Sequence, residues 1–294
     1  MLLDLISPER RPSARNRGAT LFEIQAALIP EQNRFPYQST QELVLAVETT
    51  IDSGSAEEYF IYFHGISDNE YDTIEEALRE AQLQSSVRFT FENALDAAIL
   101  RIMPRSEHHR VGTNLFSELR EKIASIPSHG SQSVQEFAAT RLQIPRVRSK
   151  EGDESLGPAT RVGWHAWPSV MIELGYSGGL DFLRLDAKWW LINSGGKTRF
   201  VIIVQIMTNP LGLRIECWKM IPSGRRQTRQ TRAWIPEQVQ DFDIDEEGVV
   251  TSASPELSIP YDCIFDEPSD NASDVVFTKA ELSSFTLWMF NLLR

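Results

Sequence analysis

One succession of expected strands and a helix in the second half of the chain constrains the fold more than any other feature. An apolar strand is expected at Ser169–Leu174, followed by the glycine-rich turn 175–179. A helix is expected at 180–192, ended by Asn193-Ser194-Gly195-Gly196. Two more apolar strands follow in the next 30 residues. This order of strand, helix, strand, strand predicts a mixed sheet flanked by helices.

The rest of the chain also alternates between helical and extended patterns. Helices are expected at 21–29, 73–84 and 107–126, and from Thr278 to near the end. Strands are expected at 42–50, 59–64, 87–91, 97–102, 199–207 and 213–220, and around Ile259. Polar loops are expected at 149–157 and 241–247. The predicted fold class is therefore α/β, in the mixed α+β sense.

The charge balance restricts the partners of the chain. Its 294 residues carry a formal net charge of −12, and an acidic protein repels nucleic acid on average. Contact with nucleic acid would need a local basic patch or bound cations. We expect no membrane contact, because no apolar run approaches the length of a membrane span and the N-terminal run is too short for a signal peptide.

The two cysteines indicate the compartment. Cys217 and Cys263 each lie in an apolar stretch, which favours two buried thiols over a disulfide. Buried thiols are typical of a reducing compartment, so cytoplasm or nucleus is the expected location.

Two carboxylates are the leading candidates for chemistry. Asp153 lies in a polar segment just before a strand, and Glu173 lies inside the apolar strand SVMIEL. Burying a carboxylate is costly unless a cation or a donor accompanies it. Two carboxylates on neighbouring elements are what a Mg²⁺ site for phosphate chemistry needs. The alternative is that Glu173 pairs with an arginine or caps the GYSGG turn.

Several longer segments resemble a known family. They are GDESLGP, WPSVMIELGYSGGLDFLRLDAKWWLINSGG, RFVIIVQI and RIECWKM, with MPRSEHH before them and LSIPYDCIFDEP after them. Together they look like the fungal-type branch of the PD-(D/E)XK nuclease superfamily, over roughly residues 89–294. The resemblance implies a restriction-endonuclease-like core.

The resemblance also implies roles for particular residues. Asp153 and Glu173 would bind Mg²⁺, helped by the backbone carbonyl of Leu174. The lysine of the motif falls at Gly175, so the usual charge-stabilising group is missing there. Lys188, in the following helix, could supply that charge if it points inward. Its alternative interpretation is an ordinary solvated lysine.

Other positions depart from the pattern of this branch. His109 stands where an acidic residue is common, and Ser177-Gly178-Gly179 stands where Ser-Glu-Ser is common. Gln205 occupies a place where some relatives carry lysine, and it cannot supply a charge.

The strongest basic run is a candidate nucleic-acid contact. Arg225, Arg226, Arg229 and Arg232 alternate with Gln and Thr, a composition that suits phosphate contacts. The alternative is a solvated linker that balances the acidic segment 241–247.

A serine nucleophile is a more distant possibility. The segment 175–179 matches Gly-x-Ser-x-Gly and would place Ser177 between a strand and a helix. An α/β-hydrolase also needs a downstream histidine, and no histidine follows His165.

These patterns predict five regions and three possible functions. The regions are a flexible basic arm (1–19), an α/β extension (20–86), a nuclease-like core (87–222), a basic then acidic linker (223–248) and a C-terminal strand and helix on the core (249–294). The functions are Mg²⁺-dependent phosphodiester hydrolysis of nucleic acid, a catalytically inactive binding module on the same fold, and a serine hydrolase.

Overall fold

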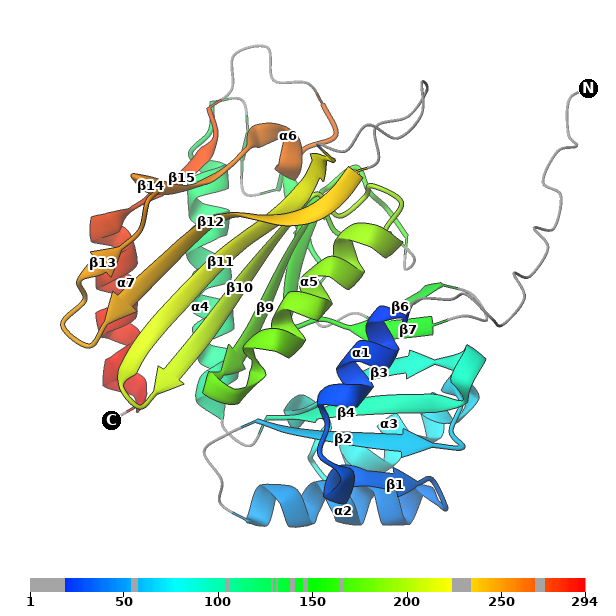
Figure 1. Cartoon of the computed structure of the whole chain (residues 1–294). Helices are drawn as coiled ribbons and strands as arrows, with labels where there is room; N and C mark the ends of the chain where they lie inside the picture. The colour runs from blue at the N-terminus through cyan, green and yellow to red at the C-terminus, as the bar shows by residue number, and fades with distance from the viewer. Residues whose placement is uncertain are drawn as a thin grey trace, which may run out of the picture.

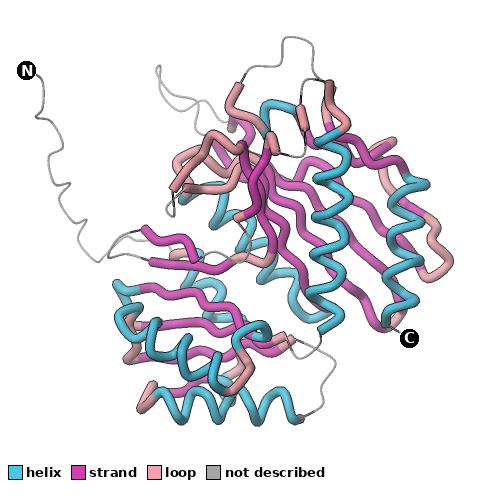
Figure 2. Tube along the Cα trace, turned by 180° about the vertical axis from the view of Figure 1, so that it is seen from behind, coloured by secondary structure: helices cyan, strands magenta, loops and turns pink. Residues whose placement is uncertain are grey.

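The structure is a computed structural model with two main sheets. It describes residues 19–293, except 54–57, 104–105, 128, 131, 138–140, 145–147, 164–165, 224–233 and 268–272. The basic arm at the N-terminus and the four arginines of the basic run lie outside the described residues, apart from Ala19. The fold is mixed α+β, with helices packed on mixed sheets (Figures 1 and 2).

Sheet A is built mainly from the first third of the chain. Its strands, in spatial order, are β1 (Arg34–Pro36), β2 (Tyr59–His64), β4 (Ala97–Ile102), β3 (Val87–Glu92), β7 (Arg148–Glu151) and β6 (Arg141–Ile144). Helices α2 (Thr40–Asp52) and α3 (Tyr71–Glu80) bury their apolar residues against one face. Helix α1 (Leu21–Leu28) packs on the other face, with Phe22 and Ala26 against Ala97 and Ile99.

Sheet B is larger and lies above sheet A in Figure 1. Its strands, in spatial order, are β13 (Val250–Thr251), β12 (Trp234–Asp245), β11 (Leu211–Pro222), β10 (Phe200–Thr208), β9 (Val170–Tyr176), β8 (Glu154–Pro158) and β5 (Val134–Glu136). Strands β9 and β10 are parallel, and α5 (Leu180–Asn193) connects them. The neighbouring pairs β8–β9, β10–β11 and β11–β12 are antiparallel.

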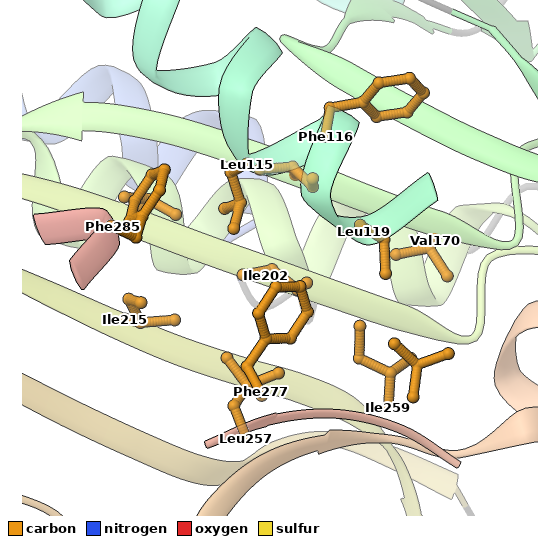
Figure 3. Close-up of a cluster of buried hydrophobic side chains, with 14 of the residues drawn as sticks. Leu115, Phe116, Leu119, Val170, Ile202, Ile215, Leu257, Ile259, Phe277 and Phe285 are labelled. Atoms are coloured by element: carbon orange, nitrogen blue, oxygen red, sulfur yellow. The ribbon is translucent and has the colours of Figure 1, made fainter. Parts of the chain in front are cut away.

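Helices cover both faces of sheet B. Helix α5 buries Leu183, Ala187 and Trp190 against one face. Helices α4 (Ser106–Ala124), α6 (Tyr261–Ile264) and α7 (Lys279–Leu293), with the small sheet β14 (Glu256–Ile259) and β15 (Val275–Thr278), cover the other. Figure 3 shows this second core, where Leu115 of α4, Ile202 of β10 and Phe285 of α7 lie together. The C-terminal helix is therefore part of the main body and does not form a separate domain.

The two sheets are joined by chain crossings and by packing. The chain passes from β7 of sheet A to β8 of sheet B through Gly152 and Asp153. A Cβ at residue 152 would lie 2.7 Å from the sulfur of Met171 and 3.1 Å from the ring of Trp190, so only glycine fits. Beside this crossing, Phe182 of α5 stacks on Phe60 of β2, with ring centroids 3.7 Å apart.

The expected strand at 42–50 was wrong, because this segment belongs to helix α2. Ser39 caps the helix by accepting a hydrogen bond from the backbone N–H of Glu42. Leu43 and Val47, four residues apart, are fully buried, while Leu45 between them is 60% exposed. This burial has the period of a helix, and the β-branched composition of the segment concealed it.

Both expected polar loops were wrong as well. Most of 241–247 continues strand β12, where Phe242 and Ile244 are buried between exposed or half-buried acidic residues. The segment 149–157 contains β7 and β8, separated only by the crossing at 152–153. In both cases a high content of charged residues concealed a strand, because the charges either alternate with apolar residues or are paired inside the protein.

The strand pairing also divides the chain differently from the expected regions. Strands β3 and β4 fall inside the expected core at 87–222, but they pair with each other and with β2 in sheet A. Residues 234–245 of the expected linker at 223–248 form the long strand β12. Sheet A therefore extends well beyond residue 86.

One smaller expectation is met by the described residues. Both cysteines are buried free thiols. None of the helices in the described ranges is long and apolar enough to cross a lipid bilayer.

Candidate functional site

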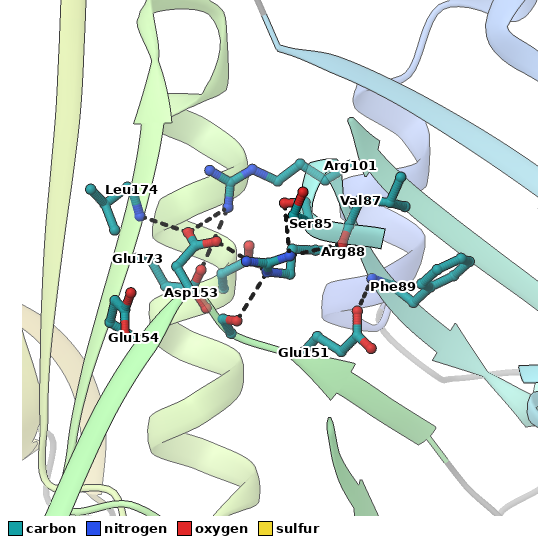
Figure 4. A network of polar contacts seen from close by, with 12 residues as sticks. Ser85, Val87, Arg88, Phe89, Arg101, Glu151, Asp153, Glu154, Glu173 and Leu174 are labelled. Carbon is teal, nitrogen blue, oxygen red and sulfur yellow. Dashed lines mark hydrogen bonds and ion pairs between the residues drawn. The ribbon is translucent and has the colours of Figure 1, made fainter. Parts of the chain in front are cut away.

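Asp153 and Glu173 converge on one arginine between the two sheets. Asp153 lies at the crossing into β8, Glu173 lies in the middle of β9, and Arg101 reaches them from β4 of sheet A (Figure 4). Nη1 of Arg101 is 3.2 Å from Oδ2 of Asp153 and 3.5 Å from Oε2 of Glu173. All three residues are at most 5% exposed. With Glu58 and Arg88, described next, they form what we call the ion cluster.

A third carboxylate, from the sheet A side, completes the surroundings of Arg101. Glu58, immediately before β2, accepts hydrogen bonds at Oε1 from Nε of Arg101 at 3.1 Å and from Nη2 at 2.6 Å. Burial alone lowers the pKa of Arg101, but Glu58, Asp153 and Glu173 together raise it above its ordinary value. The guanidinium is therefore firmly cationic and holds three carboxylates from two sheets.

Asp153 has further donors that fix its position. Its Oδ2 accepts a hydrogen bond of 2.9 Å from the backbone N–H of Leu174. Its Oδ1 lies 3.4 Å from Nε of Arg88, which comes from β3. Leu174, whose carbonyl the family resemblance assigned to a metal, thus contacts Asp153 through its N–H group.

Glu173 is the most deeply buried member of the cluster. It accepts a hydrogen bond from the indole Nε1–H of Trp190 on α5. Burial raises the pKa of Glu173 to about 8; Lys150 and Arg101 oppose this rise, and Asp153 and Asp186 add to it. The carboxyl group is therefore a weaker acid than that of an exposed glutamate.

Close packing around position 175 explains why a glycine stands there. A Cβ there would lie 2.9 Å from Cδ1 of Leu183 and 3.0 Å from Oε2 of Glu58. At Gly179 a Cβ would lie only 2.2 Å from the same oxygen. The turn 175–179 therefore accommodates the carboxylate of Glu58, in the space where the family motif would place a lysine.

A lysine that acts electrostatically on Glu173 comes from an unexpected element. Lys150 of β7 is 4% exposed, and its Nζ forms an ion pair of 2.9 Å with Oδ1 of Asp186 on α5. The same Asp186 oxygen accepts a hydrogen bond from the side chain of Gln25 on α1. Lys188, the expected lysine, instead places its Nζ 5.5 Å from the ring centroid of Trp218 on β11.

These contacts test whether the residues fit a magnesium ion. Two carboxylates do converge, as a metal centre would require. The position between them is filled by a guanidinium, however, which Glu58 holds from the other side. Among the described residues, no group of three or more His, Cys, Asp or Glu side chains is arranged to hold a metal. The side chains present fit an internal network of ion pairs better than a Mg²⁺ site.

Three other expected positions cannot be placed. The arginines 225, 226, 229 and 232 lie outside the described residues, as do the side chains of Ser177 and His109. Gln205 lies on β10, paired in register with Gly175, and is 6% exposed.

Sequence reasoning missed Arg101, Glu58 and Lys150. Arg101 had a usable signal, since a charged residue inside the apolar strand AAILRI raises the same question as Glu173 inside SVMIEL. Lys150 gave no comparable signal, because it lies in a run of charged residues that is typical of a loop.

Comparisons with known proteins add no relative. No family model, curated protein or solved structure matches this chain. The resemblance to PD-(D/E)XK nucleases therefore rests on the sequence segments quoted above.

Proposed function

We propose that this chain is a catalytically inactive binding module on a restriction-endonuclease-like fold. The observation that carries the proposal is the guanidinium of Arg101 between Asp153 and Glu173. The mixed sheet flanked by helices, with these two carboxylates on neighbouring strands, supports the nuclease-like ancestry. The guanidinium between the two carboxylates supports the loss of metal-dependent cleavage.

The ion cluster opposes a divalent cation for a physical reason. Mg²⁺ needs oxygen ligands at about 2.0–2.1 Å in octahedral geometry, so Arg101 would have to leave before the metal could bind. The departure of Arg101 would leave the buried side chain of Glu58 without its main partner. Breaking a buried ion pair in this way costs about 3–5 kcal/mol.

Metal binding and cleavage assays test the inactive state. We expect calorimetry to detect no Mg²⁺ or Mn²⁺ binding to the wild-type protein, and no cleavage of single- or double-stranded DNA or RNA. Removing the guanidinium in Arg101→Ala should expose the paired carboxylates and allow weak metal binding. Mg²⁺-dependent cleavage by the wild type that Glu173→Ala abolishes would replace this proposal with phosphodiester hydrolysis.

Nucleic acid is the partner that we propose. Arg225, Arg226, Arg229 and Arg232 supply a local cationic run in a chain whose net charge is −12. Binding of labelled DNA and RNA should weaken steeply as salt rises from 50 to 200 mM, because phosphate contacts release counterions. Replacing the four arginines by glutamine should abolish it, and unchanged binding would exclude this run. The two buried thiols support a reducing location, the cytoplasm or the nucleus.

A further inference from the structure

A second site lies at the opposite end of α5 from the glycine-rich turn. A cavity of about 630 Å³ opens between the end of α5, the end of β11, the start of β12 and helix α6. This volume is within the range of pockets that hold small organic ligands. None of its lining residues belongs to the ion cluster, so this site is separate from the proposed inactive centre.

The walls of the cavity combine an exposed aromatic ring with aliphatic side chains. Trp234 is 59% exposed and Ile192 is 50% exposed, and Leu191 and Met220 line the same cavity. Exposed apolar side chains that gather at one place, unlike scattered single ones, mark binding sites. A half-open apolar cavity beside an exposed indole suits a flat ring, which can stack on the tryptophan face.

Two cations line the same cavity. They are Arg199, at the start of β10, and Lys219, near the end of β11. Lys219 forms no ion pair with any other described residue. Arg199 contacts Asp266 at 3.0 Å, but Arg161 already binds that carboxylate through two hydrogen bonds of 2.6 and 2.8 Å. Among the lining residues the two cations therefore outnumber the carboxylates, although Glu237 lies opposite Lys219 in the register of β11 and β12.

The remaining polar groups leave this excess in place. Asp262 is the one carboxylate among the lining residues described, against the two cations. Burial raises the pKa of the Cys263 thiol to about 11, so the thiol is neutral at physiological pH. Burial and the neighbouring Arg161 lower the pKa of Arg199, as expected where like charges are not fully balanced.

We propose that this cavity binds a nucleotide, with its base against Trp234 and its phosphate on Lys219 and Arg199. Stacking is tolerant of base identity because every base has a π-face. The cations supply the charge-assisted hydrogen bonds that phosphate oxygens accept. The ligand is a free mononucleotide or one unit of a strand, since both present the same ring and phosphate.

Calorimetry with the full-length protein and three small probes tests this chemistry. AMP should bind at one site, and about tenfold or more tighter than adenosine or inorganic phosphate, because each of those lacks half of the recognised group. A tetranucleotide, d(A)₄, distinguishes the two sources. Tighter binding than AMP indicates a strand, and equal binding indicates a mononucleotide.

Single substitutions locate the site. Lys219→Gln should weaken AMP binding about tenfold. Trp234→Ala should weaken it about five- to 150-fold, the range for loss of one stacked base. Both side chains are at least partly exposed, so both variants should fold. Arg120→Gln, which removes the same charge from a 41% exposed position on α4, should leave affinity unchanged.

Two outcomes would overturn the proposal. One is the absence of AMP binding at millimolar concentration. The other is AMP binding that Lys219→Gln and Trp234→Ala both leave intact. Neither depends on metal binding or on cleavage, so this test is separate from the test of the inactive centre.

Discussion

At the scale of single residues, Arg101 is the side chain on which the ion cluster depends. It is the cation shared by Glu58, Asp153 and Glu173, and its side chain is 6% exposed. An ion pair of this kind adds little stability over an apolar core, but removing one partner leaves buried charges unpaired.

Replacing Arg101 by methionine should therefore lower the free energy of unfolding by about 3–5 kcal/mol. Urea denaturation at neutral pH measures this change. Arg120→Met is the matched control, because Arg120 is 41% exposed and its distance to Glu136 is 3.9 Å. The control should change stability by less than about 1 kcal/mol. Equal effects in the two variants would show that the cluster is not structurally important.

Glu154 gives the protein a pH-dependent stability. Burial raises the pKa of Glu154 to about 7, and the nearby Glu136 and Asp153 add to the rise. The folded protein then holds a proton that the unfolded chain releases above its ordinary pKa of about 4.5. The contribution of this group to stability is complete below pH 4.5 and is lost as pH rises to 7.

The variant Glu154→Gln should accordingly show a shallower fall of unfolding free energy between pH 5 and 7 than the wild type. Denaturation curves collected at half-unit pH intervals provide the comparison. Parallel pH profiles for the two proteins would mean that Glu154 titrates normally. Thr113, whose hydroxyl donates to Glu154, can donate equally to the amide oxygen of glutamine.

At the scale of elements, the turn between β9 and α5 is shaped by a residue from the other sheet. Glu58 fills the space beside Gly179, and it can move away only by leaving Arg101. Gly178, one residue earlier, has no atom within 4 Å of a built Cβ.

We expect Gly179→Ala to destabilise the protein by about 1–3 kcal/mol, as overpacking does in a close-packed interior. Gly178→Ala should be neutral or slightly stabilising, since alanine restricts the unfolded chain. Thermal unfolding of the two variants side by side gives the answer. If Gly179→Ala were as stable as Gly178→Ala, the carboxylate of Glu58 would not occupy this space.

Sequence patterns predicted the elements whose burial follows a simple period. Helix α5 and strands β9, β10 and β11 lie within about two residues of their expected positions. Strand β12 was missed, because its acidic residues alternate with apolar ones in a segment whose charge content is typical of a loop. Helix α2 was missed, because its capping serine and its Leu43–Val47 spacing were outweighed by β-branched composition.

At the scale of the whole molecule, the site could be predicted only in part. The local pattern around Asp153 and Glu173 correctly marked two polar residues that need a partner. Their partner, Arg101, is 52 residues before Asp153 and belongs to another sheet. The periodicity of one segment does not indicate which distant strand will face it. Whether a cation side chain or a metal ion lies between the two carboxylates could therefore be decided only from the structure.

The shared ion cluster also predicts how the molecule unfolds. All seven tryptophans lie at or after position 164, so tryptophan fluorescence reports on the part of the chain that builds sheet B. Far-UV circular dichroism reports on both sheets. Because the ion cluster and the Phe60–Phe182 stack join the sheets, the two signals should give one coincident transition in urea. Two separated transitions would show that the sheets are independent domains.

The position of β6 and β7 has a consequence for how the protein is made. These strands complete sheet A, but they are encoded between β5 and β8 of sheet B, and Glu173 comes 72 residues after Arg101. At a synthesis rate of about 5–20 residues per second, Arg101 emerges from the ribosome roughly 4–14 seconds before that carboxylate exists. During this interval sheet A carries an arginine that lacks Glu173 throughout and Asp153 for the first 52 residues of synthesis. Only the later half of the chain allows the guanidinium to leave water, so the final burial of sheet A waits for β9.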